Sequence, residues 1–475
     1  MLQRLLSFAG SSPDKIAFSC PRGALTYAQL ARRVAGAAEQ LSDLPETVGL
    51  LAGDGIDWVI ADLAVAVSGR TLVPVPEFFS REQVRHILTD AGVTCLLADS
   101  QNRETADALG MEQHPIPVSE TTRFATAAAA TGRRIIYTSG STGTPKGVRL
   151  GMRQLLASVD ALAAATQASR HDRHMSVLPQ SLLLEQVSGI YLVIQAGARC
   201  DIVSGVSRDC ARGEPDRLID ACIDLEPTTT VLVPEMLAVW VAGCAARDLT
   251  MPKSLRLAAV GGAAVPGSVI DKAWSAGIPA VIGYGLSECA SVVSLTRPGC
   301  RSYAAGQALP GIGISLDAGE IVVSGPTLMD GYLGGGDIGG RWKTGDLGIF
   351  DDDGNLVVLG RKDNVIVLAN GRNVSPEWIE HDVERNPAVR RCVVLKQPDG
   401  SLAAVVTPTQ AVPQGLAEQF ADGLIAGLAE RLPVYARPQC CILTTEERIA
   451  GAGLLTAQSK PRRQAFASHF GAASR

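Results

Sequence analysis

The chain has 475 residues, of which 46% are hydrophobic and 19% charged, and its formal net charge is −5. This length exceeds one compact core and predicts two or three domains, and the composition is that of a globular protein. The mild acidity, the lack of a basic block and an aromatic content of 4% exclude nucleic acid or an anionic membrane surface as the expected partner.

Cysteine usage and hydropathy indicate a compartment. Eleven scattered cysteines without a Cys-x-x-Cys spacing predict reduced thiols rather than disulfides or zinc ligands. The histidines form no His-Glu-x-x-His motif, and we interpret the polar cluster at residues 171–174 as surface rather than a metal site. The apolar stretch Leu182–Ala198 is interrupted by Glu185, Gln186 and Gln195, and the N-terminus lacks a signal-peptide pattern. We therefore expect a cytoplasmic protein without a membrane span.

The first 350 residues or so alternate between helical and strand-like patterns. Helices are expected at Ala28–Leu41, Trp58–Ser68 and Ser80–Ala91, the last with Ser80 as N-cap, and strands at Val48–Ala52, Thr71–Pro76, Thr94–Leu97, Ile135–Ile136, Leu255–Val260 and Ala280–Gly283. Because parallel strands need crossover helices, this alternation predicts parallel sheets covered by helices.

Beyond about residue 315 the pattern changes to short strands and turns. Expected here are strands at Glu320–Ser324 and Leu356–Leu359 around a turn at Asp353-Gly354, a helix at Pro376–Asn386 with Ser375 as N-cap, a hairpin of Arg391–Lys396 with Leu402–Thr407, and a helix at Gln414–Leu432. The predicted fold class is α/β, with a large N-terminal domain of parallel-sheet subdomains plus a β-rich subdomain (residues 1–360) and a small α+β C-terminal domain (residues 361–475).

The most informative segment is 137–148, Tyr-Thr-Ser-Gly-Ser-Thr-Gly-Thr-Pro-Lys-Gly-Val, which follows a buried strand. Its backbone N–H groups, its hydroxyls and the Lys146 ammonium together suit a polyphosphate. It is not a Walker A loop, because Pro145 precedes the lysine and Gly147 follows it. The alternative reading is a solvated Ser/Gly turn.

Further motifs follow in a fixed order. Gly261-Gly262-Ala263 and Gly283–Glu288 each come at the end of a buried strand, where glycines let the backbone approach a ligand. Trp342–Asp346 places a carboxylate in a predicted tight turn, Gly360–Asn364 lies at the predicted domain boundary, and Leu455–Lys460 forms a predicted loop near the end of the chain. Each alone has an ordinary explanation as a turn, a helix start or a solvated tail.

Together these motifs resemble those of the AMP-forming ligases, which comprise acyl- and aryl-CoA synthetases, peptide-synthetase adenylation domains and luciferases, over about residues 10–465. Residues 137–148 look like that family's phosphate loop, and Gly283–Glu288 look like its Gly-Tyr-Gly-x-Thr-Glu motif, with Ser287 in place of Thr. Thr344–Asp346 resemble its ribose motif, and Gly360–Asp363 resemble its hinge motif. Leu455–Lys460 resemble its Leu-Thr-x-x-Gly-Lys ending, with Ser459 in place of Gly.

The resemblance implies ATP, Mg²⁺ and CoA (or the phosphopantetheine of a carrier protein) as cofactors, a small carboxylic acid as substrate, and a mobile C-terminal domain that turns about a hinge at Asp363. It implies catalytic roles for Lys460, Glu288 (the Mg²⁺ ligand), Ser287 (toward the α-phosphate) and Lys146. ATP-binding roles fall on Thr138, Ser139, Gly140, Ser141, Thr142, Gly143, Gly262, Ala263, Tyr284 (against adenine), Gly285, Asp346 (toward the ribose) and Arg361.

The acid-binding segment Leu178–Gln186 is similar to a stretch of fatty-acyl synthetases that reads Leu-Pro-x-Ser-His-x-x-Glu-Arg, with Leu182 for the histidine and Gln186 for the arginine. An apolar helix at Val187–Ala196 would line the pocket, although a purely packing helix fits these residues equally. The residues assigned to the acid pocket are Ser181, Leu182 and Gly283. No acidic residue is clearly placed to hold an α-amine, which favours a fatty or aromatic acid.

The leading hypothesis is an ATP-dependent ligase that forms an acyl-AMP, releases pyrophosphate and transfers the acyl group to the thiol of CoA. The alternative acceptor is a carrier-protein phosphopantetheine. A non-catalytic adenylate-binding protein is the hypothesis from another class, and intact Lys460, Glu288 and Asp346 argue against it. Nothing in the sequence requires the oxygen chemistry of a luciferase.

Overall fold

The computed structural model describes residues 1–121, 132–138, 145–336, 338–368, 373–428, 431–456 and 461–471. The chain divides into two compact units. The larger comprises Met1–Ala263, Ala273–Ser315 and Val322–Trp342, and the smaller comprises Ala264–Lys272, Leu316–Ile321 and Lys343–Arg475. The domain boundary at residues 360–361 stays a prediction.

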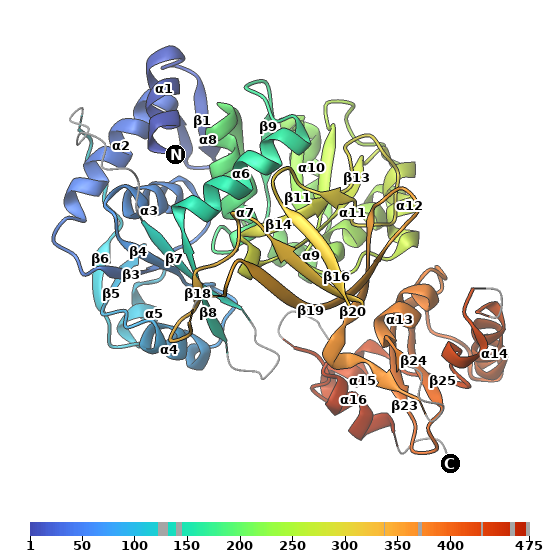
Figure 1. The fold of residues 1–475 in the computed structure, drawn as a ribbon. Coiled ribbons are helices and arrows are strands. Elements are labelled where there is room, and N and C mark those ends of the chain that lie inside the picture. Colours follow the sequence, from blue (N-terminus) through green and yellow to red (C-terminus); the bar gives the residue numbers. More distant parts are fainter. Residues whose placement is uncertain are drawn as a thin grey trace. The chain divides into compact units, whose positions relative to one another are not determined.

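One sheet of the larger unit has seven strands in the order β18-β8-β7-β4-β3-β5-β6 (Figure 1). Their bounds are β3 Thr47–Leu51, β4 Thr71–Pro74, β5 Cys95–Ala98, β6 Glu112–Pro115, β7 Arg133–Thr138, β8 Lys146–Gly151 and β18 Gly331–Tyr332. The pairs among β3 to β7 are parallel, whereas β8 pairs antiparallel with both β7 and β18. The two antiparallel pairs therefore lie at one edge of an otherwise parallel sheet.

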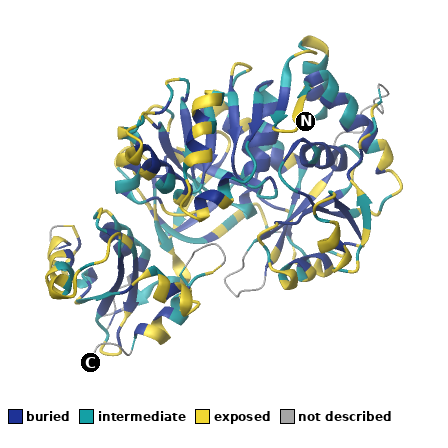
Figure 2. Ribbon diagram, turned by 180° about the vertical axis from the view of Figure 1, so that it is seen from behind, coloured by how far each residue is buried: buried dark blue, intermediate teal, exposed yellow. Residues whose placement is uncertain are grey.

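Helices cover this sheet on both faces, with α3 and α4 on opposite sides (Figure 1). The helices in this part of the chain are α2 Tyr27–Gln40, α3 Ile56–Val67, α4 Arg81–Asp90 and α5 Arg103–Asp107. They confirm the three predicted helices, and Ser80 caps α4 by accepting a hydrogen bond from the Gln83 N–H at 3.2 Å. Nearly all of β3, β4 and β5 is buried, as expected for parallel strands covered on both sides (Figure 2).

The other large sheet has nine strands in the order β15-β14-β13-β12-β11-β9-β10-β1-β2. Its strands are β1 Ile16–Cys20, β2 Gly23–Thr26, β9 Arg173–Ser176, β10 Arg199–Ile202, β11 Thr229–Leu232, β12 Leu257–Val260, β13 Ala280–Leu286, β14 Ser291–Leu295 and β15 Gln307–Ala308. The helices along this stretch and at the N-terminus are α1 Leu2–Ser11, α6 Met152–Thr166, α7 Leu183–Glu185, α8 Leu192–Ala196, α9 Val206–Ala211, α10 Asp216–Leu225, α11 Pro234–Ala246 and α12 Gly267–Ser275. Strands β1 and β9 to β13 are joined by parallel pairs.

The remaining strands form three small sheets with the orders β16-β17-β19-β20, β21-β22 and β23-β24-β25. Their bounds are β16 Gly313–Asp317, β17 Glu320–Ser324, β19 Arg341–Phe350, β20 Leu356–Arg361, β21 Ile366–Val367, β22 Asn373–Val374, β23 Val389–Lys396, β24 Leu402–Pro408 and β25 Cys440–Leu443. The helices of this part are α13 Pro376–Glu384, α14 Ala417–Gly427, α15 Glu446–Gly451 and α16 Arg463–Phe470.

The three-stranded sheet of the smaller unit separates two cores. Cys392 and Val394 point to a core shared with α13 and α14, whereas Val393 and Leu395 point to a core shared with α15 and α16. This follows from the alternation of side chains along a strand. The predicted hairpin of this unit is confirmed as β23 and β24.

Two sequence predictions need correction here. The helix expected at Gln414–Leu432 is a 3₁₀ turn at Gln414–Leu416 followed by α14, which ends at Gly427 because glycines weaken it and Pro433 lies close behind. The tight turn expected at Trp342–Asp346 lies instead within the ten-residue strand β19. Among the described residues, no helix combines the length and apolarity that a bilayer crossing requires.

Candidate active site

The segment predicted to bind phosphates is flanked by paired strands. Strand β7, with Ile135 and Ile136 buried as expected, runs antiparallel to β8, and Thr138 pairs with Lys146. The hairpin register therefore sets the Lys146 backbone opposite Thr138, at the two ends of the loop. The other predicted phosphate-binding residues lie outside the described part of the chain, and their roles stay predictions; they are Ser139, Gly140, Ser141, Thr142 and Gly143.

Two glycine motifs meet at one edge of the nine-stranded sheet. Strands β12 and β13 are parallel neighbours, so Gly261-Gly262-Ala263, which follows β12, comes close to Gly283–Gly285 in the last part of β13. A Cβ on Gly285 would lie 1.8 Å from the Ser291 carbonyl oxygen, so only glycine fits there. Tyr284 lies between the glycines, half-buried and paired with Ser294 of β14.

Ser287 and Glu288 follow β13 directly, in a 3₁₀ turn that spans Ser287–Cys289. The next two residues, Ala290 and Ser291, both have positive φ, at 53° and 94°. Such a conformation is uncommon for residues with a side chain and persists only where the surroundings enforce it. The sharp turn leaves the side chains of Ser287 and Glu288 half-exposed at the sheet edge.

A residue that the motif analysis missed, Tyr332, contacts two of the predicted site residues. Its hydroxyl donates to Glu288 Oε1 at 2.7 Å, and the Lys146 Nζ lies 5.8 Å from the centre of its ring. The only sequence signal for this position is the glycine directly before it, Gly331, whose φ of 121° requires glycine. The structure thus brings Glu288 and Lys146 to one side chain.

A single carboxylate fits the Mg²⁺ that the resemblance implies for this site. Among the described residues, no three His, Cys, Asp or Glu side chains gather as a metal-binding group. Mg²⁺ in nucleotide-binding enzymes commonly takes one or two carboxylates, with phosphate oxygens and water completing the shell. Glu288, half-exposed and with Oε1 bonded to Tyr332, fits that pattern.

In the smaller unit, Asp346 lies on β19 beside Arg361 of β20. Arg361 Nη1 donates to Asp346 Oδ1 and to the Thr344 carbonyl oxygen, both at 3.1 Å. Gly345 has a φ of 74°, and its N–H donates to Glu320 Oε1 at 3.1 Å. The strand is therefore bent next to Asp346, which gave the sequence its turn-like pattern.

Glu320 holds the same region in place through hydrogen bonds to it. It is buried, and its Oε2 accepts a hydrogen bond from Lys362 Nζ at 2.7 Å. The Lys362 hydrogen bond holds the pKa of Glu320 below its ordinary value. Lys362 comes directly after Arg361, so this carboxylate fixes the motif from which Arg361 projects.

The predicted hinge residue Asp363 is exposed, within a 3₁₀ turn at Lys362–Asn364. Asn364 donates to Glu377 Oε1 at 2.5 Å, and Arg463 forms an ion pair with Glu377 at 3.1 Å. Glu380, one helical turn after Glu377, accepts two hydrogen bonds from the same Arg463, at 2.7 and 2.6 Å. Lys460 itself lies outside the described residues, and its role stays a prediction; its flanking residues Leu455 and Pro461 form a β-bridge.

The segment assigned to the acid pocket starts with Ser181 and Leu182, both half-buried, just before α7. The predicted helix Val187–Ala196 is helical, but its first part is a π-turn spanning Gln186–Tyr191, and α8 follows it. Gln186 Nε2 donates to the Ser181 carbonyl oxygen at 3.2 Å. The assignment of Ser181, Leu182 and Gly283 to a pocket stays a prediction.

The side chain of Glu185 points away from solvent at the start of this π-turn. It is fully buried, and its Oε1 lies 3.7 Å from His174 Nε2. A Cβ on Gly189 would lie 2.1 Å from that Oε1, so the carboxylate occupies space that another residue at 189 would need. His174 Nδ1 lies 3.0 Å from Thr229 Oγ1, which completes a polar chain between β11, β9 and α7.

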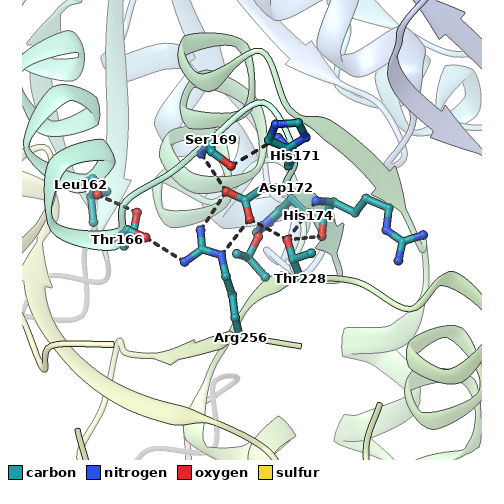
Figure 3. Close-up of polar contacts among 10 residues, drawn as sticks. Leu162, Thr166, Ser169, His171, Asp172, His174, Thr228 and Arg256 are labelled. Carbon is teal, nitrogen blue, oxygen red and sulfur yellow. Dashed lines mark hydrogen bonds and ion pairs between the residues drawn. The ribbon is translucent and has the colours of Figure 1, made fainter. Parts of the chain in front are cut away.

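The prediction of a polar surface at residues 171–174 is wrong for Asp172 and His174, which are both buried. Figure 3 shows why: Arg256 forms a two-pronged ion pair with Asp172, with Nε and Nη2 each 2.8 Å from a carboxylate oxygen. Thr228 Oγ1 also donates to Asp172 Oδ1 at 2.8 Å. The ion pair of Asp172 and Arg256, which we call the bracket, joins the starts of strands β9 and β12, and Thr228 adds the start of β11.

Comparison with known proteins places these features in a family. Residues 7–333 match the family described as AMP-binding enzyme, and residues 363–437 match the AMP-binding enzyme C-terminal domain. The long-chain-fatty-acid–CoA ligase FadD15 of Mycobacterium bovis is 26% identical over 475 residues, covering 81% of this chain and 77% of that protein. The 2-succinylbenzoate–CoA ligase of Bacillus cereus is 28% identical over 494 residues, covering 95% of this chain and 96% of that enzyme.

Two further similarities concern a larger protein and a solved structure. A probable nonribosomal peptide synthetase, CymA of Salinispora arenicola, is 30% identical over 462 residues, which cover 87% of this chain and 5% of that protein. The crystal structure of the anthranilate CoA ligase AuaEII in complex with anthranoyl-AMP matches with a TM-score of 0.85 at 21% identity, covering 100% of this chain and 97% of that one. This likeness confirms the predicted α/β fold class with a smaller α+β part.

Proposed function

Because the chain belongs to the AMP-binding enzyme family, we propose that it is an ATP-dependent ligase that joins a carboxylic acid to a thiol through an acyl-AMP. The family match confirms the resemblance that the order of motifs predicts. In the first half-reaction an acid carboxylate attacks the α-phosphorus of ATP and pyrophosphate leaves. In the second, the thiol of CoA attacks the acyl carbonyl and AMP leaves.

The observation that carries this proposal is the grouping of Glu288, Tyr332 and Lys146 at the sheet edge. ATP and the acid are both anionic, so a site that joins them must neutralise charge and hold the reacting atoms in line. Lys146 supplies a fixed positive charge at the end of the phosphate loop. Glu288 supplies the hard oxygen ligand that Mg²⁺ prefers, and the cation, when bound, neutralises the phosphate charge as it shifts toward the leaving pyrophosphate.

The remaining residues take roles around the nucleotide. Thr138 and the loop after it hold the β- and γ-phosphates, and Ser287 donates to the α-phosphate. Tyr284 stacks on adenine while the Gly262-Ala263 backbone lies along the edge of the base. Asp346 accepts hydrogen bonds from both ribose hydroxyls, since a carboxylate has two oxygens for this purpose, and Arg361 orients it. Lys460 bridges the acid carboxylate and the α-phosphate in the transition state.

The second half-reaction requires a different group near the adenylate. Lys460 and a pantetheine arm compete for one face of it, so we assign Asp363 as the hinge about which the C-terminal domain turns between the two steps. Asp363 lies in a 3₁₀ turn, and Gly360 just before it has a φ of 136°. Short segments with such special conformations are where large backbone rotations are absorbed.

For the acid we propose a fatty or aromatic substrate. The π-turn segment that follows Ser181 and Leu182 is largely apolar and buried. Two relatives are named as a long-chain-fatty-acid–CoA ligase and a 2-succinylbenzoate–CoA ligase. Acids that are apolar near the carboxylate are therefore the first candidates.

A pyrophosphate-exchange screen tests the proposed function. Purified protein with Mg²⁺ and ATP is offered fatty, benzoic, cinnamic and amino acids in turn, and exchange of labelled pyrophosphate into ATP is measured. We expect exchange with at least one fatty or aromatic acid and none with amino acids. Absence of exchange with every acid would refute adenylation, and exchange with amino acids alone would refute the substrate class.

A second acceptor is favoured by one specific observation, the 30% identity to a segment of a probable nonribosomal peptide synthetase. In this version the acyl group passes to the phosphopantetheine arm of a carrier protein. The two acceptors are separated by supplying the best acid with either CoA or a holo carrier protein and measuring thioester formation by mass spectrometry. CoA thioester alone supports the first acceptor, and acylated carrier alone supports the second.

We place the reaction in the cytoplasm, which supplies ATP and CoA. All eleven cysteines are unpaired, and a reducing compartment keeps thiols in that state. Fractionation of the source cells with an antibody to the protein tests the location.

A further inference from the structure

The segment Met329–Leu333 joins the two parts of the phosphate site through its backbone. The Met329 N–H donates to the Glu288 carbonyl oxygen at 2.9 Å, and the Leu333 N–H donates to the Gly147 carbonyl oxygen at 2.7 Å. Between these bonds, β18 pairs with β8 so that Tyr332 lies opposite Val148. The segment is therefore fastened at one end to the turn that carries Glu288 and at the other to the strand that begins with Lys146.

From this arrangement we infer that Tyr332 is a positioning residue for both charges of the ATP site: its hydroxyl orients the Glu288 carboxylate toward the metal and its ring orients the Lys146 ammonium. The inference rests on the proposed function, because it assigns Glu288 and Lys146 to metal and phosphate. It adds a residue that lies outside every motif singled out in the sequence. Neither role requires Tyr332 to touch the reacting atoms.

The hydroxyl acts by restricting the carboxylate. Tyr332 Oη donates to Oε1 of Glu288 at 2.7 Å, a charge-assisted hydrogen bond of good length. With Oε1 engaged, Oε2 is the oxygen that Glu288 presents to a cation. Mg²⁺ has a strict octahedral geometry and takes a carboxylate through one oxygen more readily than through both. Groups that orient metal ligands in this way commonly contribute 10- to 100-fold to metal affinity.

The ring acts on the lysine. Lys146 Nζ lies 5.8 Å from the centre of the Tyr332 ring, within the range of a cation–π contact. The ring itself is steadied by Trp342, whose ring centre lies 5.8 Å away at an interplanar angle of 72°. The aromatic face thus limits the rotamers of a long side chain that otherwise samples many. The hydroxyl and the ring have separable effects, which makes the inference testable.

Two substitutions separate them. Tyr332→Phe removes the hydroxyl and keeps the ring, and Tyr332→Leu removes both. Tyr303→Phe is the matched control, because Tyr303 is exposed, packs on Trp274 and has no assigned role in the site. Circular dichroism and thermal melting establish that each variant is folded.

The readout independent of activity is Mn²⁺ binding, measured by electron paramagnetic resonance in the presence of a non-hydrolysable ATP analogue. We expect Tyr332→Phe to weaken Mn²⁺ binding by roughly 10-fold or more while binding of the metal-free analogue stays unchanged. Tyr332→Leu should weaken Mn²⁺ binding equally and also weaken the metal-free analogue, by a few-fold, the size of an exposed cation–π contact. The Mg²⁺ concentration that half-saturates pyrophosphate exchange should rise in parallel in both variants.

The outcomes distinguish a failure of this inference from a failure of the proposed function. If wild-type protein shows no exchange with any acid, the proposed function fails. If the wild type is active and Tyr332→Phe binds Mn²⁺ as the wild type does, only the positioning role fails. Equal weakening of Mn²⁺ binding by Tyr332→Phe and Tyr303→Phe would also refute it, since the effect would then not be local.

Discussion

In the larger unit, the backbones that carry Glu288 and Lys146 are joined by hydrogen bonds to the segment Met329–Leu333. In the smaller unit, the ladder of β19 and β20 ends at the pair Asp346 and Arg361, and the turn Lys362–Asn364 after it is held by side-chain contacts to Glu320 and Glu377. A strand ladder does not rearrange without local unfolding. Ion pairs between partly exposed side chains exchange readily and weaken in salt. Glu288 and Lys146 are therefore held by backbone pairing, whereas the proposed hinge is held by side-chain contacts that can open.

The largest expected effect falls on Lys460, whose proposed role is to bridge the acid carboxylate and the α-phosphate in the transition state. Lys460→Ala should lower adenylation by roughly 10²–10³-fold or more, the loss typical of one preorganised group that stabilises developing charge. Thioester formation from a supplied acyl-AMP should be affected far less. Pyrophosphate exchange and single-turnover thioester formation measure the two steps, and equal losses in both would contradict separate conformations for the two half-reactions.

Asp363→Pro should show the reverse order of losses. Proline fixes φ near −65°, which suits the 3₁₀ turn seen at Lys362–Asn364 and opposes any other conformation. We expect thioester formation to fall by about tenfold or more, equivalent to about 1.4 kcal/mol in the barrier, with adenylation nearly retained. Asp363→Ala, which restricts nothing, is the control and should behave as the wild type in both assays.

Asp346→Asn tests the ribose assignment. The amide presents one acceptor oxygen in place of two and carries no charge, so the KM for ATP should rise by about 10- to 100-fold, the range for hydrogen bonds to a charged group. The kcat should change less than the KM. Asp352→Asn, an exposed carboxylate in the same hairpin, provides the control. A KM that stays at the wild-type value would remove Asp346 from the nucleotide site.

The smallest effect on activity is expected for substitutions at the bracket formed by Asp172 and Arg256, because these residues contribute to folding stability. Asp172→Asn should lower the free energy of unfolding by about 1–3 kcal/mol, because Arg256 loses its two-pronged partner. Arg256→Lys should cost a similar amount, since an ammonium cannot reproduce the fork. Urea denaturation measures both, and a wild-type midpoint in either variant would contradict the bracket role.

The same pair predicts a pH dependence. Burial alone would raise the pKa of Asp172, but hydrogen bonds from Arg256 and two further donors outweigh it and the pKa is lowered. The unfolded chain therefore binds this proton at higher pH than the folded one. The stabilisation is complete above the ordinary aspartate pKa of about 3.9 and is lost as the pH falls through the folded pKa. Asp172→Asn should flatten the stability profile in that window.

The sequence was sufficient for features set by local chemistry. Apolar runs, the Ser80 cap and the order of glycine motifs predicted the strands, α4 and the sites where Ser287 and Glu288 leave the sheet. The bend beside Asp346 was read as a turn, because a glycine in a strand looks the same in sequence as a glycine in a turn. Residues whose roles arise from long-range pairing were not found: Tyr332 reaches Glu288 across 44 positions, and Asp172 reaches Arg256 across 84.

The π-turn at Gln186–Tyr191 bears on how the proposed preference for a fatty or aromatic acid is open to change. A π-turn closes five residues apart where an α-turn closes four, so it is equivalent to one residue inserted into an ordinary helix. Deleting a single residue there would restore α-helical spacing while the helical turns on either side keep their facing, because the π-turn absorbs the extra residue locally. Altering the length of this proposed pocket wall is thus an engineering route distinct from substituting its side chains.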